Sequence, residues 1–277
     1  VILREAKAEI KKLYVGLGGQ TLKTTTNRVK RLIGDDDVTA DLLSDMLDEN
    51  RKIRIENNEI YEIIPQEYLV DDEFEFDPEG MTCSNLQGVY KIICGKPELR
   101  RNLQRSFEKT NLETAMFISP IATAEAALSE KDKEMGCALI DFGAETTSVC
   151  VYFNGYLRHL AVIPFGGNVI TNDIKDLNLT QAVSEKLKMK FGNAVSEFDT
   201  DPRHIVLPAA NDAEQHISTY FLASIIQARV SEILDIVWNE IEKSTFATRL
   251  GTVSVLTGGR ANLNNLHEPI KLQTGFH

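Results

Sequence analysis

The sequence feature that most constrains the fold is a pair of apolar runs joined by a polar turn and followed by an Asn-Gly pair. Residues 137–140 read Cys-Ala-Leu-Ile, and residues 148–153 read Ser-Val-Cys-Val-Tyr-Phe. Short apolar runs bounded by turn residues are typical of buried strands. Asn154 and Gly155 tolerate the positive φ of a two-residue hairpin turn, and residues 156–163 continue as the returning strand. The segment therefore predicts an antiparallel sheet in the middle of the chain.

The rest of the chain alternates helical and strand-like periods, which is typical of an α/β protein. Apolar residues about one turn apart predict helices over 96–110 and 221–243. Residues 11–95 are more polar and mixed, and predict a small α+β unit. The remaining expected elements are a helix over 1–12, a helix capped by Thr39, a helix over 122–128, and strands over 13–17, 60–64, 67–70, 89–94, 115–118 and 253–256.

The chain is acidic, because 30 Lys and Arg stand against 41 Asp and Glu and give a formal net charge of −11. This charge argues against a protein that coats nucleic acid or an anionic membrane, although a local nest of backbone N–H groups can still bind a nucleotide. No apolar run approaches the ~18 residues of a membrane span. The five histidines lack metal-ligand spacing, and the four cysteines form no C-x-x-C pair, which predicts buried free thiols in a reducing compartment. Because the sequence starts at Val1 without Met and stops abruptly at His277, we expect a piece of a longer protein.

Two motifs near the predicted hairpin could face phosphate. Residues 141–147 read Asp-Phe-Gly-Ala-Glu-Thr-Thr. An Asp at a strand end can hold Mg²⁺ through water, while turn N–H groups and Thr hydroxyls can face phosphate oxygens. Residues 166–168, Gly-Gly-Asn, open the next helix, where N–H donors and the positive end of the helix dipole favour an anion. Taken alone, each motif is better explained as a plain turn.

Two later motifs could face a nucleoside. Glu185 and Lys188 lie three residues apart and project from one helix face, so the carboxylate could accept ribose hydroxyls and the Lys stem could lie along a purine. A solvated ion pair explains this pair better in isolation. Residues 256–261, Leu-Thr-Gly-Gly-Arg-Ala, combine a strand, a Gly-Gly turn and a helix start, which lets backbone approach a base or phosphate closely.

The order and spacing of the four motifs resemble the second half of the nucleotide cleft in the actin, DnaK-chaperone and sugar-kinase ATPases. Within this superfamily the sequence is similar to the FtsA family of bacterial cell-division proteins, with a Bacteroidetes-like character. The stretch 157–174, which contains Arg-His-Leu-Ala-Val-Ile-Pro-Phe-Gly-Gly-Asn, is highly specific for this family. Further matching stretches lie at 63–68, 119–128, 225–230 and 255–259, so the resemblance covers essentially the whole chain.

The resemblance implies an α/β fold, namely the actin-like (ribonuclease H-like) two-lobed ATPase fold with an inserted small α+β subdomain of SHS2 type, called 1C. The implied boundaries are 1–10 for the end of the first half of subdomain 1A, 11–95 for subdomain 1C, 96–135 for the second half of 1A, 136–175 for subdomain 2A, 176–248 for subdomain 2B and 249–277 for the return to 2A.

The resemblance also implies ATP and Mg²⁺ as cofactors. By motif match, Asp141 would face the metal through water. The residues implied to contact the phosphates are Gly143, Thr146, Thr147, Gly166, Gly167 and Asn168. Those implied to meet the ribose, the base and the adenosine side are Glu185, Lys188, Gly258 and Gly259. No residue is implied to be catalytic.

Three residues depart from the family's pattern. Ala144 and Glu145 replace two glycines of the usual Gly-Gly-Gly-Thr-Thr turn, and the Glu145 carboxylate would repel a polyphosphate unless it points outward. Ser119 stands where the family has an acidic residue that helps to order the attacking water. These departures imply at most a weak ATPase, in which the nucleotide has a regulatory or structural role. The first phosphate hairpin of the superfamily is expected before Val1, so we expect this chain alone to bind nucleotide weakly or not at all.

The implied function is a scaffold at the division septum, on the cytoplasmic face of the inner membrane. Such a protein polymerises through subdomain 1C, tethers FtsZ to the membrane through an amphipathic helix expected after His277, and meets other divisome proteins. The acidic FtsZ tail is expected to dock on the helix over 221–243, with Arg229 as the partner of a carboxylate. An intradomain ion pair of Arg229 is the equal alternative. The alternative functions are a PilM-like type IV pilus adaptor and a small-molecule kinase of the same superfamily.

Overall fold

The structure, a computed structural model, describes residues 10–110, 112–208, 214–251, 254–259 and 262–274. Contacts divide the chain into two units, of which the first holds residues 1–126 and 155–162 and the second holds residues 127–154 and 163–277. Nearly all of the helix predicted over 1–12 lies outside the described residues.

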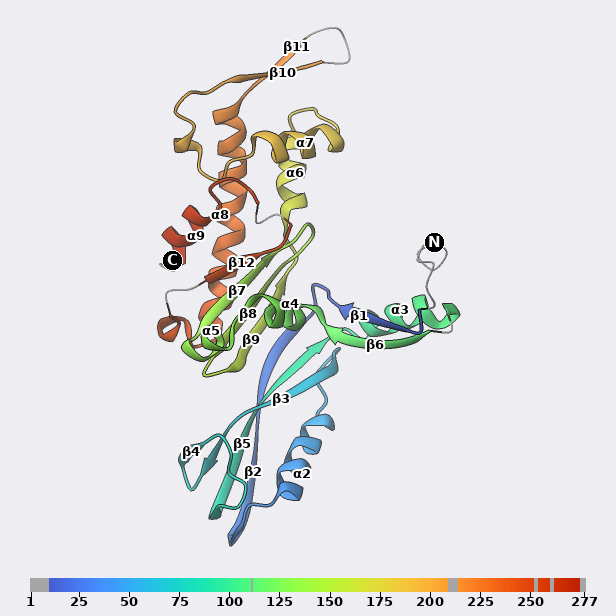
Figure 1. The fold of residues 1–277 in the computed structure, drawn as a ribbon, viewed down its shortest axis with the longest axis vertical. Helices are drawn as coiled ribbons and strands as arrows, with labels where there is room; N and C mark the ends of the chain where they lie inside the picture. Colours follow the sequence, from blue (N-terminus) through green and yellow to red (C-terminus); the bar gives the residue numbers. More distant parts are fainter. Residues whose placement is uncertain (1–9, 111, 209–213, 252–253, 260–261, 275–277) are drawn as a thin grey trace. The chain divides into compact units, whose positions relative to one another are not determined.

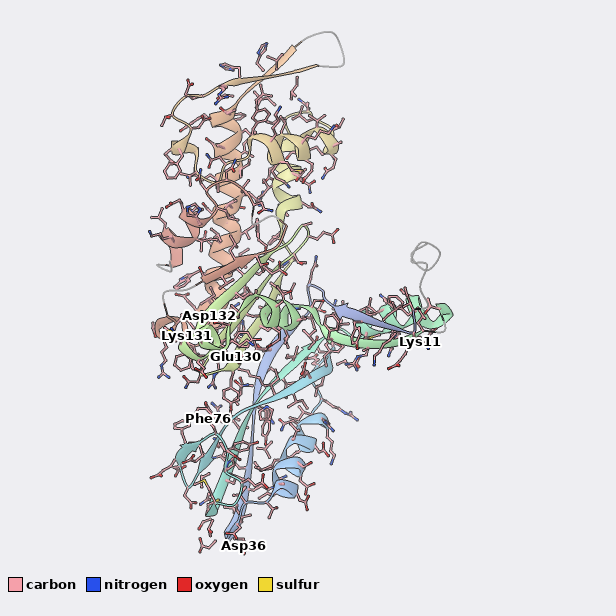
Figure 2. All side chains as sticks on the ribbon, in the orientation of Figure 1. Lys11, Asp36, Phe76, Glu130, Lys131 and Asp132 are labelled. Atoms are coloured by element: carbon pink, nitrogen blue, oxygen red, sulfur yellow. The ribbon has the colours of Figure 1, made fainter. Side chains whose placement is uncertain are left out.

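The first unit contains a long antiparallel sheet (Figure 1). Its strands lie in the order β9 (Tyr156–Ile163), β2 (Lys23–Asp37), β5 (Thr82–Gly95), β3 (Glu59–Val70) and β4 (Glu73–Glu75). The sequence did not predict β2, because most of its side chains are polar and exposed and no apolar alternation marks it. Figure 2 shows Asp36 near the C-terminal end of β2, where it pairs in register with Cys83 of β5.

Strand β3 corrects the prediction of two separate strands over 60–64 and 67–70. The two runs form one strand, and its register against β5 shifts between Pro65 and Glu67. Proline has no N–H to donate to a neighbouring strand, so an irregularity at this point lets the strand continue beyond it.

Helix α2 (Ala40–Arg51) packs against this sheet and begins where the sequence predicts. The Thr39 hydroxyl accepts a hydrogen bond from the Leu42 N–H at 3.2 Å. Met46 is fully buried, and the buried Asn50 side chain donates to the Met46 carbonyl at 2.8 Å. Together with Met46, the core consists of Val29, Val38, Tyr68, Val70, Cys83, Leu86 and Tyr90.

The other part of the first unit is a parallel pair of strands, β1 (Lys12–Leu17) and β6 (Glu113–Ile118). Helices α3 (Glu98–Phe107) and α4 (Ser119–Ala127), with the short 3₁₀ turn Glu108–Thr110, complete it. These elements confirm the predicted strands and helices to within a few residues. Helix α4 starts earlier than predicted because proline, here Pro120, is compatible with the first turn of a helix.

The central sheet of the second unit has the order β12 (Ser254–Thr257), β7 (Cys137–Phe142) and β8 (Thr147–Phe153). Strands β7 and β8 are antiparallel, which confirms the strands predicted from the two apolar runs, and β12 is parallel to β7. Asn154 and Gly155 follow β8 with φ of 53° and 78°, as a two-residue hairpin turn requires.

Helices pack around this sheet in the second unit (Figure 1). They are α5 (Glu130–Met135), α6 (Gly167–Lys175), α7 (Gln181–Phe191), α8 (Thr219–Lys243) and α9 (His267–Thr274), with the 3₁₀ turns Ser196–Phe198 and Ala247–Arg249 and the hairpin of β10 (His204–Pro208) and β11 (Glu214–Ser218). The buried stripe of α8 is Leu222, Ala223, Ile226, Val230, Ile233, Leu234, Val237 and Ile241. All four cysteines are buried free thiols, as predicted. Among the described helices, none is both long and apolar enough to cross a membrane.

Met46→Ala tests the packing of α2 on its sheet. We expect a loss of about 2–4 kcal/mol of unfolding free energy, because the substitution leaves a cavity at a fully buried site. Asp45→Ala is the matched control on the same helix, since Asp45 is exposed and a change within about 0.5 kcal/mol is expected. Urea unfolding followed by far-ultraviolet circular dichroism measures both variants, and equal effects would contradict this packing.

Candidate functional site

The turn between β7 and β8 is closed by its own backbone. The Gly143 N–H donates to the Thr146 carbonyl at 3.0 Å. Thr147 is fully buried, and its hydroxyl donates to the Phe165 carbonyl at 2.8 Å. Ala144 and Glu145 are exposed, so the Glu145 carboxylate faces solvent and not the interior of the turn.

The start of α6 packs directly on this turn. The Gly167 N–H donates to the Gly143 carbonyl at 3.0 Å, and the Asn168 N–H donates to the Ala144 carbonyl at 2.7 Å. A Cβ at Gly166 would lie 2.7 Å from both of these carbonyl oxygens, so glycine is needed for the close approach. The structure thus joins the two predicted phosphate motifs. Phosphate binding by the N–H groups of Gly167 and Asn168 stays a prediction. It would require these groups to leave the carbonyl oxygens of Gly143 and Ala144 and to donate to phosphate oxygens.

The predicted Glu185–Lys188 pair on α7 is largely buried and not the solvated ion pair of the alternative interpretation. The Lys188 side chain is 5% exposed, and its ammonium lies 2.8 Å from Glu185 Oε2. Lys188 Nζ also donates to the Gly167 carbonyl at 2.7 Å. The Thr171 hydroxyl donates to Glu185 Oε2 at 2.6 Å. The pair therefore connects α7 to the first turns of α6.

A pocket of about 170 Å³ opens beside Lys188. This volume is below the ~300–1,000 Å³ of a complete small-molecule site, so the pocket can receive one ring system of a larger ligand. Three predicted residues line it, namely Gly167, Lys188 and Gly259. The sequence did not single out its other lining residues, Phe142, Ile170, Met189, Gly192, Asn262, Leu263 and Asn264. Gly192 had a usable signal, since a glycine directly after a predicted helix is a common helix end.

Asp141 and Gly258 lie side by side at the end of the sheet. Asp141 pairs in register with Thr257 of β12, and burial raises the pKa of its carboxyl group. Gly258 has φ of 100°, and a Cβ there would lie 2.5 Å from the Phe142 carbonyl oxygen and 2.6 Å from Asp141 Oδ1. No cluster of three metal-ligating side chains exists among the described residues. One carboxylate fits Mg²⁺ that keeps most of its waters, which is the mode predicted for Asp141.

Arg229 on α8 forms the intradomain ion pair that was its alternative interpretation. Its guanidinium donates to both carboxylate oxygens of Asp173 on α6, at 2.6 and 3.0 Å, and to Glu232 at 2.6 Å. The Asp173 carboxylate raises the pKa of Arg229. The side chain remains 32% exposed, so the predicted contact with a partner carboxylate would have to compete with Asp173.

Gly258→Ala and Gly259→Ala form a matched pair that tests the close approach at Asp141. We expect Gly258→Ala to lower the unfolding free energy by at least about 2 kcal/mol, because its φ is strained for alanine and its Cβ would meet backbone. Gly259→Ala should stay within about 0.5 kcal/mol, since its Cβ would meet no atom of the described residues within 4 Å. Urea unfolding followed by the fluorescence of the single tryptophan, Trp238, measures this difference in the second unit. Equal effects would show that the turn is built differently.

Two models of known protein families match most of this sequence. A model described as "Cell division protein FtsA" matches residues 138–275, and a model described as "SHS2 domain inserted in FTSA" matches residues 19–94. The second match lies within the insert predicted over 11–95.

Curated relatives match most of this chain. The cell division protein FtsA of Neisseria meningitidis serogroup B is 30% identical over 269 residues, which cover 95% of this chain and 65% of the relative. That of Bacillus subtilis is 36% identical over 206 residues, which cover 73% of this chain and 47% of the relative. The chain thus spans two thirds or less of these relatives. Porphyromonas gingivalis FtsA is 24% identical over 271 residues, covering 96% of this chain and 57% of the relative, and the Bacteroidetes-like character stays a prediction.

Solved structures show the same fold. A PilM–PilN type IV pilus biogenesis complex matches with a TM-score of 0.66 and 16% identity, over 99% of this chain and 70% of that one. MreB5 of Spiroplasma citri bound to ADP matches with a TM-score of 0.56 and 18% identity, over 64% of this chain and 58% of that one. The predicted actin-like α/β fold with an SHS2-type insert is thereby confirmed. Because the two family models together match most of the sequence, the chain belongs to the FtsA family of cell division proteins.

Proposed function

We propose that this chain is part of an actin-like cell-division scaffold that binds an adenine nucleotide in its second unit. The observation that carries the proposal is the buried Glu185–Lys188 pair beside the pocket, in a chain of the FtsA family. Solved MreB5 structures of the same fold are bound to ADP and AMPPNP, which supports this class of ligand.

Each part of the site has a proposed role. The pocket lined by Lys188 and Gly259 receives the base, and Glu185 accepts hydroxyl groups of the ribose. The turn after β7 and the start of α6 face the phosphates, with Asp141 holding Mg²⁺ through water. The metal, when bound, neutralises phosphate charge. We infer at most a weak ATPase, since Ser119 offers no carboxylate to order an attacking water.

Lys188→Met tests the nucleotide site. Methionine keeps an apolar stem but removes the buried ammonium, which should weaken binding of ADP by at least about tenfold because the pair with Glu185 and the contact to Gly167 are lost. Lys186→Met is the matched control, since Lys186 is exposed on the same helix and should bind as the wild type does. Fluorescence anisotropy of a labelled ADP measures both, on the protein at its natural length.

The controls decide what a negative result means. Equal losses in the two variants would indicate a change of net charge and not a site at Lys188. A folded wild type that binds neither ADP nor ATP would overturn the nucleotide function itself.

We further propose that the protein polymerises through the SHS2-type subdomain and tethers FtsZ to the cytoplasmic face of the inner membrane at the septum. Membership of the FtsA family supports this role. In the sheet of the first unit, Leu32 and Phe74 are 86% and 70% exposed, and exposed large apolar side chains of this kind support a subunit contact. Attachment to the inner membrane and contacts with other divisome proteins are further parts of this proposal.

Arg229→Ala and Asp173→Asn together test the proposed FtsZ site. If Arg229 binds a carboxylate of the acidic tail, Arg229→Ala should weaken binding of an FtsZ tail peptide by about tenfold or more. Asp173→Asn removes the charge of one of the two internal carboxylates that pair with the same guanidinium, so the variant should bind the peptide at least as well as the wild type. Anisotropy of a labelled peptide measures the three affinities.

The pattern across these variants separates the two interpretations of Arg229. Equal weakening by both substitutions would mean that the ion pair only supports α6 and α8. Unchanged peptide binding in both variants would indicate that the FtsZ tail binds to another surface. The second candidate function is a PilM-like adaptor, because the fold resembles that of a PilM–PilN complex over 99% of this chain. A folded protein that does not bind the FtsZ tail but binds a peptide of an inner-membrane pilus protein would favour this candidate.

A further inference from the structure

Thr171 occupies the centre of the buried network between α6 and α7. Its hydroxyl oxygen accepts a hydrogen bond from Lys188 Nζ at 2.5 Å and lies 2.6 Å from Glu185 Oε2 and 3.1 Å from the Gly167 carbonyl oxygen. The residue is fully buried on α6. Thr171 belongs to the family-specific stretch 157–174, but the sequence assigned it no role, because a threonine inside a helix does not reveal which side chains it will contact.

Thr171 forms one hydrogen bond within its own helix and two contacts with charged groups of α7. A buried threonine often returns a hydrogen bond to the carbonyl four residues earlier, and the contact with Gly167 is of that kind. The contacts with Glu185 and Lys188 instead cross to α7 and involve two charged groups. Hydrogen bonds to charged groups contribute about twice as much as neutral ones.

The network fixes the direction of the Lys188 ammonium. Its three N–H groups have three oxygen partners, on Gly167, Thr171 and Glu185. The ammonium is thus held against α6, and Lys188 also lines the pocket. Lys188 and Gly167 both line that pocket, so the Thr171 hydroxyl group contacts two of the residues that form it.

We propose that Thr171 is a positioning residue for nucleotide binding, which acts on the ligand through Lys188, Glu185 and Gly167. It couples the nucleoside side of the site, on α7, to the phosphate side, at the start of α6. This inference rests on the proposed nucleotide function, because positioning has meaning only if the pocket binds a nucleotide.

Two substitutions of Thr171 test the role of its hydroxyl group. Thr171→Val keeps the shape but removes the hydroxyl, and it should weaken ADP binding about tenfold. Thr171→Ser keeps the hydroxyl and should bind ADP within about threefold of the wild type, since only a methyl group is lost. Anisotropy of labelled ADP on the protein at its natural length gives both affinities, and unfolding followed by Trp238 fluorescence shows that each variant is folded.

Two controls separate positioning from loss of stability. Val237→Ala, at a fully buried site on α8, should destabilise the second unit but leave ADP affinity unchanged. In a Lys188→Met background, Thr171→Val should add clearly less than its loss of about tenfold in the wild type, because part of its effect passes through that lysine. A full additional tenfold loss would contradict the proposed route.

The outcomes also distinguish this inference from the function on which it rests. If the wild type binds ADP and Thr171→Val binds it equally well, the positioning role is overturned and the nucleotide site stands. If Val237→Ala weakens ADP binding as much as Thr171→Val does, the effect is one of stability and the inference fails. If the folded wild type binds no nucleotide, the proposed function and this inference both fail.

Discussion

The buried ammonium of Lys188 is the constraint on which the candidate site depends. A charge that is 5% exposed is tolerated only when close oxygens replace its water, since the effective penalty for burying an ion is several kcal/mol. Glu185 supplies one of these oxygens from the same helix, while Thr171 and Gly167 supply the others from α6. Helices α6 and α7 therefore cannot separate without exposing this charge to an incomplete shell of partners. The wall of the pocket is defined by electrostatics as much as by apolar packing.

A second constraint is the approach of backbone to backbone at glycines. Gly166 brings the start of α6 against the carbonyls of the β7–β8 turn, and Gly258 brings the end of β12 against Phe142 and Asp141. A Cβ at either position would lie at or below 2.7 Å from a carbonyl oxygen, which is closer than real side chains come. Close approaches of main chain thus position two neighbours of these glycines that line the pocket, Gly167 and Gly259, and side chains such as Lys188 complete its lining.

Much of this fold could be predicted from local patterns, and the misses have physical causes. The buried strands β7 and β8 can be recognised in the sequence as apolar runs. Strand β2 cannot, because most of its side chains face water and are polar. The motifs Gly166-Gly167 and Glu185–Lys188 could be found by spacing. Asn262 and Leu263 could not, and Thr171, although it lies in the family-specific stretch 157–174, could not be given its contacts, because these arise only when distant segments meet. Nor could the sequence decide between a solvated and a buried ion pair, since burial depends on what packs above it.

The two basic side chains that contact α6, Lys188 and Arg229, differ in exposure, and this difference suits the two proposed tasks. Lys188 is buried, so breaking its pair is costly, and the nucleoside end of the site stays formed. Arg229 is 32% exposed and Asp173 is 23% exposed, so water can reach this pair and compensate part of its loss. An acidic partner could therefore replace Asp173 at a lower cost than breaking the contacts of Lys188, while the Thr171 network, two residues away on the same helix, remains intact. Under the proposed function, helix α6 thus presents a rigid face to the nucleotide and an exchangeable ion pair to the partner.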